Sequence, residues 1–204
     1  TAFAVVLLVG SMAGAGEVSS PVKLADLDLP LTVQESAGVE RKGDICSTGV
    51  PLPLGMIQEP DGIALFDDKG AAVPAQFRVL ERWPNLGDNK SVKWLLVTFL
   101  TDASKDGKSV YHLKAGKNPA PARPVKIEEK GDAYEMGGQV FKKDFSGPFR
   151  LVLTDPDGKE ITSAEVPVTW SVWESGPIRS CLRAESPTAP DKFGFIAWVY
   201  AYAD

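Results

Sequence analysis

The fold class of this chain is decided by three stretches, Gly49-Val-Pro-Leu-Pro-Leu-Gly-Met-Ile57, Ala75-Gln-Phe-Arg-Val-Leu-Glu-Arg-Trp-Pro84 and Ser91-Val-Lys-Trp-Leu-Leu-Val97. They combine turn residues, strand-like apolar runs and a surface rich in basic and aromatic side chains. They hold no catalytic nucleophile, metal-binding cluster or pair of acids. The three stretches therefore predict a β scaffold that presents a surface, and not a reaction centre.

The composition also indicates an all-β protein. The 204 residues include 19 Gly and 16 Pro, which are spread along the chain as in proteins with many turns. No segment shows a sustained apolar repeat of about 3.6 residues, so we expect very little helix. The formal net charge of −5 disfavours a nucleic-acid partner, because phosphate binding needs clustered Lys and Arg.

The clearest strand signals lie in the first half of the chain. Residues 62–66 and 73–80 are expected to pair across a turn at Asp67-Asp-Lys-Gly70. Within the second of these strands, alternation predicts that Gln76 and Arg78 face water together. Residues 92–100 are apolar on both faces, which is typical of a central strand.

A Pro-rich stretch at 117–124, Lys-Asn-Pro-Ala-Pro-Ala-Arg-Pro, has little to bury and predicts a stiff linker. It separates a first domain at 17–116 from a second at 125–204, where short strands alternate with turns such as Gly137-Gly138. The last strand runs to Asp204 with apolar residues on both faces and no partner after it. We therefore expect the natural protein to continue beyond both ends of this sequence.

Residues 1–16 are expected to be a partial signal peptide that lies outside the fold. The apolar run at 2–9 is about half as long as a membrane span, and Ala13-Gly14-Ala15 supplies the small residues that signal peptidase reads. This predicts a secreted or periplasmic protein with no membrane contact after the signal is removed, and a short membrane anchor is the alternative. In an oxidising compartment Cys46 and Cys181 are candidates for a disulfide, with two buried free thiols as the alternative.

The order of these motifs resembles the N-terminal domain of the exo-rhamnogalacturonan lyase and YetA-like family of polysaccharide lyases. The resemblance rests on the three quoted stretches and, more loosely, on Glu174-Ser-Gly-Pro-Ile-Arg179 in the second domain. It implies a small RIFT-type β-barrel followed by an incomplete antiparallel β-sandwich. It also implies that the catalytic α/α toroid, which acts on acidic pectic polysaccharide, lies downstream, so that no catalytic residue of the family is carried over to this chain.

The residues themselves give no catalytic site. Cleavage of a uronate by β-elimination needs a base, a group that stabilises the enolate and an acid. His112 is the only histidine and lies in a strand-like run at 110–113, where a structural role is expected. Asp61, Asp67 and Asp68 lack the spacing of a calcium loop and are better explained as turn formers. We therefore expect no catalytic residue, metal or cofactor in this chain.

Sugar contact is the functional hypothesis that the sequence supports. Aromatic rings stack on the C–H faces of sugars, while basic side chains bind hydroxyl and carboxylate groups. The candidate residues are Arg78, Arg82, Trp83 and Lys93, with Trp94 beside them. A structural role is the alternative for each of them, with Trp94 in the core and Trp83 over the end of the barrel. The sandwich core or a domain interface is the expected place of Trp170, Trp173 and Trp198.

Three functions are open at this point. The favoured one is the non-catalytic N-terminal portion of a secreted polysaccharide lyase, inactive alone and supporting a downstream toroid. The alternatives are a glycan-binding β-module and a cell-surface structural β-domain without enzymatic activity. Helical repeats downstream would favour the first, and further β-domains would favour the last.

Overall fold

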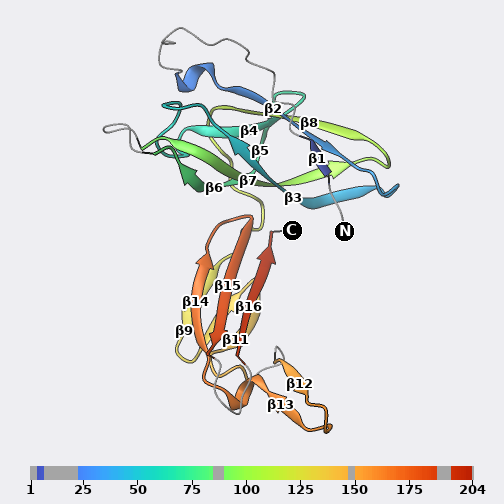
Figure 1. Ribbon diagram of the computed structural model, residues 1–204. Helices are drawn as coiled ribbons and strands as arrows, with labels where there is room; N and C mark the ends of the chain where they lie inside the picture. Colours follow the sequence, from blue (N-terminus) through green and yellow to red (C-terminus); the bar gives the residue numbers. More distant parts are fainter. Residues whose placement is uncertain (1–3, 7–22, 85–89, 147–149, 188–193, 204) are drawn as a thin grey trace. The chain divides into compact units, whose positions relative to one another are not determined.

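The computed structural model describes residues 4–6, 23–84, 90–146, 150–187 and 194–203, which form an all-β protein (Figure 1). Helical structure among them is limited to two short 3-10 turns, Leu24–Asp26 and Ser163–Glu165. The expectation of an all-β chain with very little helix is confirmed. In the described part of the chain no helix has the length and apolar character needed to cross a membrane. The chain divides into two compact units, Thr1–Pro121 and Ala122–Asp204.

Two antiparallel sheets build the first unit (Figure 1). One has the order β1-β2-β8-β4-β5, formed by Ala4–Val6, Asp28–Gln34, Lys108–Ala115, Ile63–Asp67 and Ala72–Val73. The other has the order β3-β7-β6, formed by Arg41–Pro51, Val92–Ala103 and Ala75–Arg82. The pairing of β7 with both β3 and β6 confirms that the apolar segment at 92–100 is a central strand. Neither sheet closes on itself through the described strands, so open sheets stand where a closed barrel was expected.

Side chains from both sheets form one core in this unit. Leu31, Leu65 and Leu113 come from the first sheet and Val97 and Phe99 from β7, and each is at most 1% exposed. Because side chains alternate between the two faces of a strand, a slip by one residue would turn this whole set toward water. Burial of these residues therefore fixes the register of the strands that carry them.

Pro74 divides the strand that was expected at 73–80. Before it, β5 pairs with β4 across the expected turn, in which Gly70 has a φ of +80°. After it, β6 belongs to the other sheet and pairs with β7. Proline has no N–H to contribute to a ladder of hydrogen bonds, which explains why the chain changes sheets at this residue.

The segment expected to be a signal peptide is partly placed in a sheet. Ala4–Val6 forms β1 and pairs antiparallel with β2. Residues 1–3 and 7–16 lie outside the described residues. The structure thus differs from the expectation for β1, and export of the protein stays a prediction.

Asn118, in the Pro-rich stretch, is attached to the first unit by its side-chain amide. The Oδ1 atom accepts a hydrogen bond from the N–H of Ala75 at 3.1 Å, and the Nδ2 atom donates to the carbonyl of Ala75 at 2.6 Å. This amide makes the two bonds that a neighbouring strand would make. The division between the units, at Pro121 and Ala122, falls within the stretch at 117–124.

Three antiparallel sheets build the second unit. Their orders are β11-β10-β9 (Gln139–Lys142, Ala133–Met136, Ile127–Lys130), β12-β13 (Val152–Thr154, Glu160–Thr162) and β14-β15-β16 (Thr169–Glu174, Arg179–Ser186, Phe195–Tyr202). Gly137 and Gly138 join β10 to β11 with φ values of +58° and +77°. Two consecutive residues with positive φ are what a tight hairpin turn needs, and the turn expected at this glycine pair is confirmed.

An aromatic cluster joins β14 to the β10-β11 hairpin. Trp170 stacks on Phe145 with ring centroids 5.0 Å apart, and the rings of Tyr134 and Phe141 are each 6.3 Å away. The indole Nε1 donates a hydrogen bond to the carbonyl of Lys143 at 3.0 Å. Trp170 therefore has the packing role that was expected of it, and its polar atom is satisfied.

Candidate functional site

Three of the four sugar-binding candidates lie together at the ends of β6 and β7. The Nζ atom of Lys93 is 5.6 Å from the centroid of the Trp83 ring, which is within range of a cation–π contact. The same Nζ atom is 3.0 Å from Oε1 of Glu81, and Arg82 follows Glu81 on β6. Lys93 thus contacts both Trp83 and the acidic Glu81, while Arg82 lies beside Glu81 in the strand. We refer to these four neighbouring residues as a cluster.

The polar groups of this cluster are occupied by the protein itself. Arg82 donates to the carbonyls of Gln58 and Lys90 at 2.6 and 2.8 Å. It also bonds to the carboxylate of Glu59 at 2.7 Å. The Nε1 atom of Trp83 donates to the carbonyl of Leu52 at 3.0 Å. These bonds fasten loops to the sheet, so the arrangement is better suited to structure than to ligand binding.

The outer face of the same sheet differs from its prediction at three positions. Gln76, expected to face water, is only 8% exposed, and Arg78 beside it is half-buried. Trp94, expected in the core, is 38% exposed, and its ring lies over Gly49, where an added Cβ would be 3.6 Å from the ring. In the register of β6 and β7, Arg78 is opposite Leu96, which is two residues along β7 from Trp94. Arg78, the fourth candidate, is therefore not part of the cluster of Arg82, Trp83 and Lys93.

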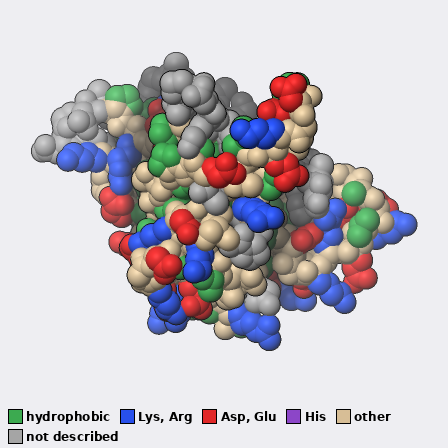
Figure 2. Space-filling model, turned by 90° about the horizontal axis from the view of Figure 1, so that it is seen from below, with side chains coloured by type: hydrophobic (Ala, Val, Ile, Leu, Met, Phe, Trp, Pro, Cys, Tyr) green, Lys and Arg blue, Asp and Glu red, His purple; other side chains and the backbone are tan. Residues whose placement is uncertain are grey.

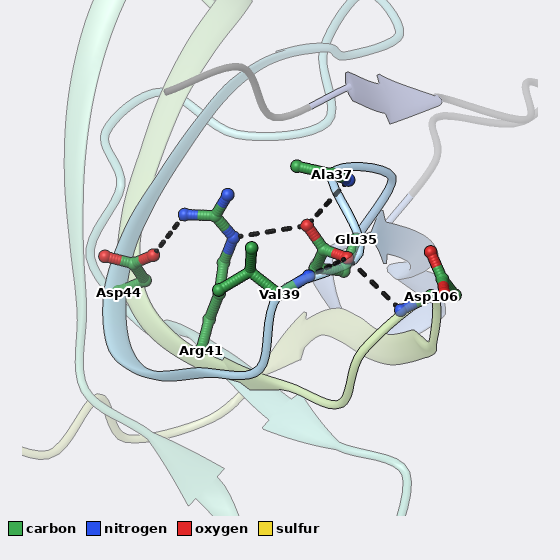
Figure 3. A network of polar contacts seen from close by, with 6 residues as sticks. All are labelled: Glu35, Ala37, Val39, Arg41, Asp44 and Asp106. Atoms are coloured by element: carbon green, nitrogen blue, oxygen red, sulfur yellow. Dashed lines mark hydrogen bonds and ion pairs between the residues drawn. The ribbon is translucent and has the colours of Figure 1, made fainter.

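Glu35 is the centre of a buried polar network in the first unit (Figure 3). The carboxylate accepts hydrogen bonds from the backbone N–H groups of Ala37, Val39 and Asp106 at 2.8, 3.1 and 3.2 Å. The Nε atom of Arg41 is 3.5 Å from Oε1, and Arg41 also pairs with Asp44 at 2.9 Å. Figure 3 shows these groups converging on the carboxylate from the loops around it.

The electrostatics of Glu35 are those of a structural carboxylate. Burial, with 1% exposure, by itself raises the pKa of the group, but the backbone N–H donors outweigh it and lower the pKa to about 2. A general base or acid needs a pKa near the working pH and access to a substrate, and Glu35 has neither. No sequence pattern predicted this network, because its contact with Asp106 joins segments 71 positions apart.

His112 and the aspartates considered for calcium also have structural partners. The Nδ1 atom of His112 is 2.7 Å from the carboxylate of Asp28, and Lys114 reaches the same carboxylate at 3.1 Å. Asp67 accepts hydrogen bonds from the N–H groups of Lys69 and Ala71 in its own turn. Among the described residues no group of three or more His, Cys, Asp or Glu is placed to hold a metal ion.

The two cysteines are free thiols in the structure. Cys46 is 1% exposed in the core of the first unit, and Cys181 is fully buried in the second. Burial raises the pKa of both thiols, that of Cys46 to about 11. This arrangement corresponds to the alternative of two buried thiols, and the disulfide is not formed here.

The most exposed set of aromatic rings lies in the second unit, on the outer face of the β14-β15-β16 sheet. Trp173 on β14 is 52% exposed, and Trp198, Tyr200 and Tyr202 on β16 are 46%, 44% and 45% exposed. Trp173 stands at a bulge between Val172 and Glu174, and bulges re-aim side chains. Trp173 and Trp198 do not lie in the sandwich core, since each exposes about half of its surface, and the alternative that they lie at a domain interface stays a prediction.

Two arginines of β15 lie between these rings. Arg183 is directly opposite Trp198, and its guanidinium carbon is 5.9 Å from the ring centroids of both Trp173 and Trp198. Arg179 is opposite Tyr202, and its guanidinium carbon is 5.6 Å from the Tyr200 ring. We call this surface the aromatic–arginine face; it consists of Trp173, Arg179, Arg183, Trp198, Tyr200 and Tyr202.

The charges of the aromatic–arginine face are balanced. Arg179 bonds to Glu174 at 2.8 Å, and Arg183 bonds to Glu185 at 2.5 Å. Figure 2 shows that on one side of the molecule basic and acidic side chains are interspersed rather than gathered by sign. Because each of its arginines is paired with a glutamate, the aromatic–arginine face is an apolar, ring-bearing surface with positioned donors, and not a broad cationic patch.

The sequence could not identify this face, because β16 reads Phe-Ile-Ala-Trp-Val-Tyr-Ala-Tyr and is apolar at every position. A strand of this kind has no polar alternation to distinguish its inner side from its outer side. The usable signal was the spacing of Trp198, Tyr200 and Tyr202, which places three rings on one face of any strand.

Comparisons of the chain with protein-family models, with curated proteins and with solved structures found no significant match.

Proposed function

We propose that this chain is a non-catalytic, glycan-binding β-module of an exported polysaccharide-degrading protein, and that the aromatic–arginine face is its binding surface. The single observation that carries the proposal is the display of four large aromatic rings on one sheet face, each 44–52% exposed. Large rings are normally buried, and their grouping at the surface is typical of a binding site.

The chemistry of the face fits a carbohydrate. Aromatic rings offer flat apolar area for the C–H faces of sugars at a small loss of side-chain freedom. Arg183 is held between Trp173 and Trp198, so its remaining N–H donors are positioned beside the rings. A surface with both properties is able to hold a sugar ring by stacking and to bond its hydroxyl groups.

The resemblance of the quoted motifs to the exo-rhamnogalacturonan lyases supports a more specific proposal, in which this chain is the N-terminal portion of a polysaccharide lyase. In that proposal the two sheets of the first unit correspond to a RIFT-type barrel and the second unit to a β-sandwich. Both assist a downstream catalytic toroid that acts on rhamnogalacturonan-type pectic polysaccharide. The present chain is then inactive alone, and unsaturated-uronate absorbance produced by the purified chain would contradict this.

The binding proposal is tested by affinity electrophoresis of the whole chain in gels that contain rhamnogalacturonan. We expect retardation of the wild type, and Trp198→Ala should weaken binding by about tenfold or more, as for other exposed anchor residues. Trp83→Ala is the matched control, because Trp83 is a tryptophan whose indole N–H is bonded inside the protein. Equal retardation of the wild type and Trp198→Ala, or none for either, would overturn the proposal.

The second candidate function, a structural β-domain without glycan binding, predicts no retardation for any of these proteins. Wild-type mobility that is unchanged by the polysaccharide would favour it.

A further inference from the structure

A cavity of about 520 Å³ opens in the second unit beside Tyr202, the last ring of the aromatic–arginine face. The charged residues that line it are Arg123, Lys126, Glu128 and Glu135. The turn at Gly137-Gly138 completes the wall. This volume is within the range of small-ligand sites in proteins.

The cavity is continuous with the face through two stacked rings. Tyr202 and Tyr200 have ring centroids 6.2 Å apart and an interplanar angle of 17°. Tyr202 belongs to the face through its exposed ring and also lines the cavity. A chain molecule lying on the rings of β16 therefore reaches the cavity at its Tyr202 end.

The charges in the cavity favour an anionic group. Glu128 and Glu135 are both directed to Lys130, at 3.2 and 2.5 Å, so their charges are partly neutralised. Lys126 is exposed and forms no ion pair with any described residue. Lys126 thus gives the cavity wall a positive charge that no carboxylate of the described residues pairs with, and such a group is a point where the carboxylate of a ligand is stabilised.

The glycine turn gives this wall an open surface of backbone. An added Cβ at Gly138 would meet nothing within 4 Å. At Gly137 an added Cβ would lie 3.0 Å from the Cβ of Ala201, so only the Gly138 half of the turn is open.

We propose that the cavity is a subsite for a uronic acid unit, whose carboxylate is bound by Lys126 while the adjoining sugars stack on the aromatic–arginine face. This inference rests on the proposed function, since it places the acidic unit at the end of a glycan held by the rings. It goes further by assigning recognition of the carboxylate to the cavity in the second unit, because the face alone does not distinguish a neutral glycan from an acidic one.

The test is calorimetric titration of the whole chain with two probes, an oligogalacturonate and its fully methyl-esterified form of equal length. We expect the wild type to bind the free acid about tenfold more tightly at low salt, as for one charge-assisted contact. Lys126→Met should remove this preference and leave the affinity for the ester unchanged, while Lys126→Arg should retain it. Lys159→Met is the matched control, because Lys159 is an exposed lysine in the turn between β12 and β13 and away from this wall.

The outcomes separate the two proposals. Equal affinity of the wild type for both probes, or an unchanged preference in Lys126→Met, overturns the uronate subsite and leaves the glycan-binding function standing. Failure of the wild type to bind either probe overturns the uronate subsite, and the glycan-binding function is then decided by the retardation in rhamnogalacturonan gels. The subsite is supported if Lys126→Met loses the preference for the acid while Lys126→Arg and Lys159→Met keep it. Added salt should then weaken binding of the free acid and leave binding of the ester unchanged.

Discussion

The backbone N–H of Asp106 donates a hydrogen bond to Oε2 of Glu35 across 3.2 Å, although 71 positions separate the two residues. Glu35 thus joins the loop after β2 to the loop between β7 and β8. The same carboxylate accepts N–H groups from its own loop, so one ionised side chain organises two turns that are distant in sequence.

Glu35 should make the stability of the chain depend on acid pH. Its pKa is about 2 in the folded protein against 4.5 for an unperturbed glutamate, so the ionised form stabilises the fold at higher pH. This contribution is lost as the pH falls from 4.5 toward 2, because the unfolded chain then binds a proton that the folded chain does not. Urea unfolding midpoints measured across this window should fall more steeply for the wild type than for Glu35→Gln.

Glu40→Gln is the control for this measurement, because Glu40 lies in the same loop and is 68% exposed beside Lys42. It should follow the wild-type curve. If the urea midpoints of the wild type and Glu35→Gln fall in parallel as the pH is lowered, the ionised Glu35 carboxylate does not stabilise the fold.

Arg82→Ala should lower stability without affecting glycan retention. The variant loses bonds to two carbonyls and to Glu59, and we expect a cost of about 1 kcal/mol because the site is partly open to water. Lys93→Ala breaks only the exposed pair with Glu81 and should cost about 0.5 kcal/mol or less. Denaturant unfolding measures the stability of both variants, and affinity electrophoresis measures their retention by the glycan. A variant that loses retention but keeps its stability would show that the binding site lies in the first unit.

Cys46 and Cys181 should be unreactive in the folded protein. Both thiols are buried and their pKa values are raised, so neither forms the reactive thiolate readily. An aromatic disulfide reagent should label neither cysteine at neutral pH and both after denaturation, including in protein prepared without reductant. A single disulfide in such a preparation, with no thiol released by denaturant, is the contrary result.

Much of the strand arrangement was accessible from the sequence. The apolar run at 92–100 identified β7 as a central strand, and the glycine turns placed two hairpins. These features are local, since they depend on period, composition and the backbone freedom of glycine. The change of sheets at Pro74 was missed because a proline signals an interruption without saying which partner the chain takes next.

The candidate site was predicted less well, for a physical reason. Arg82 and Trp83 have the residue types of a sugar-binding surface, but their polar atoms are bonded to carbonyls from other loops. Trp173 and Trp198 were expected in the sandwich core or at a domain interface, and only the three-dimensional structure shows that they are exposed on the face of a sheet. Whether a residue is available to a ligand depends on contacts between distant segments, which no local pattern encodes.

The outer strand β16 carries three of the exposed rings and, among the described strands, is hydrogen-bonded only to β15. In this chain its second edge has no described strand beside it and borders an apolar, strongly β-forming sequence. Such an edge is a template for a strand from another molecule, and concentration promotes that pairing. The same strand that displays the rings is therefore the one from which self-association of this chain is expected to start.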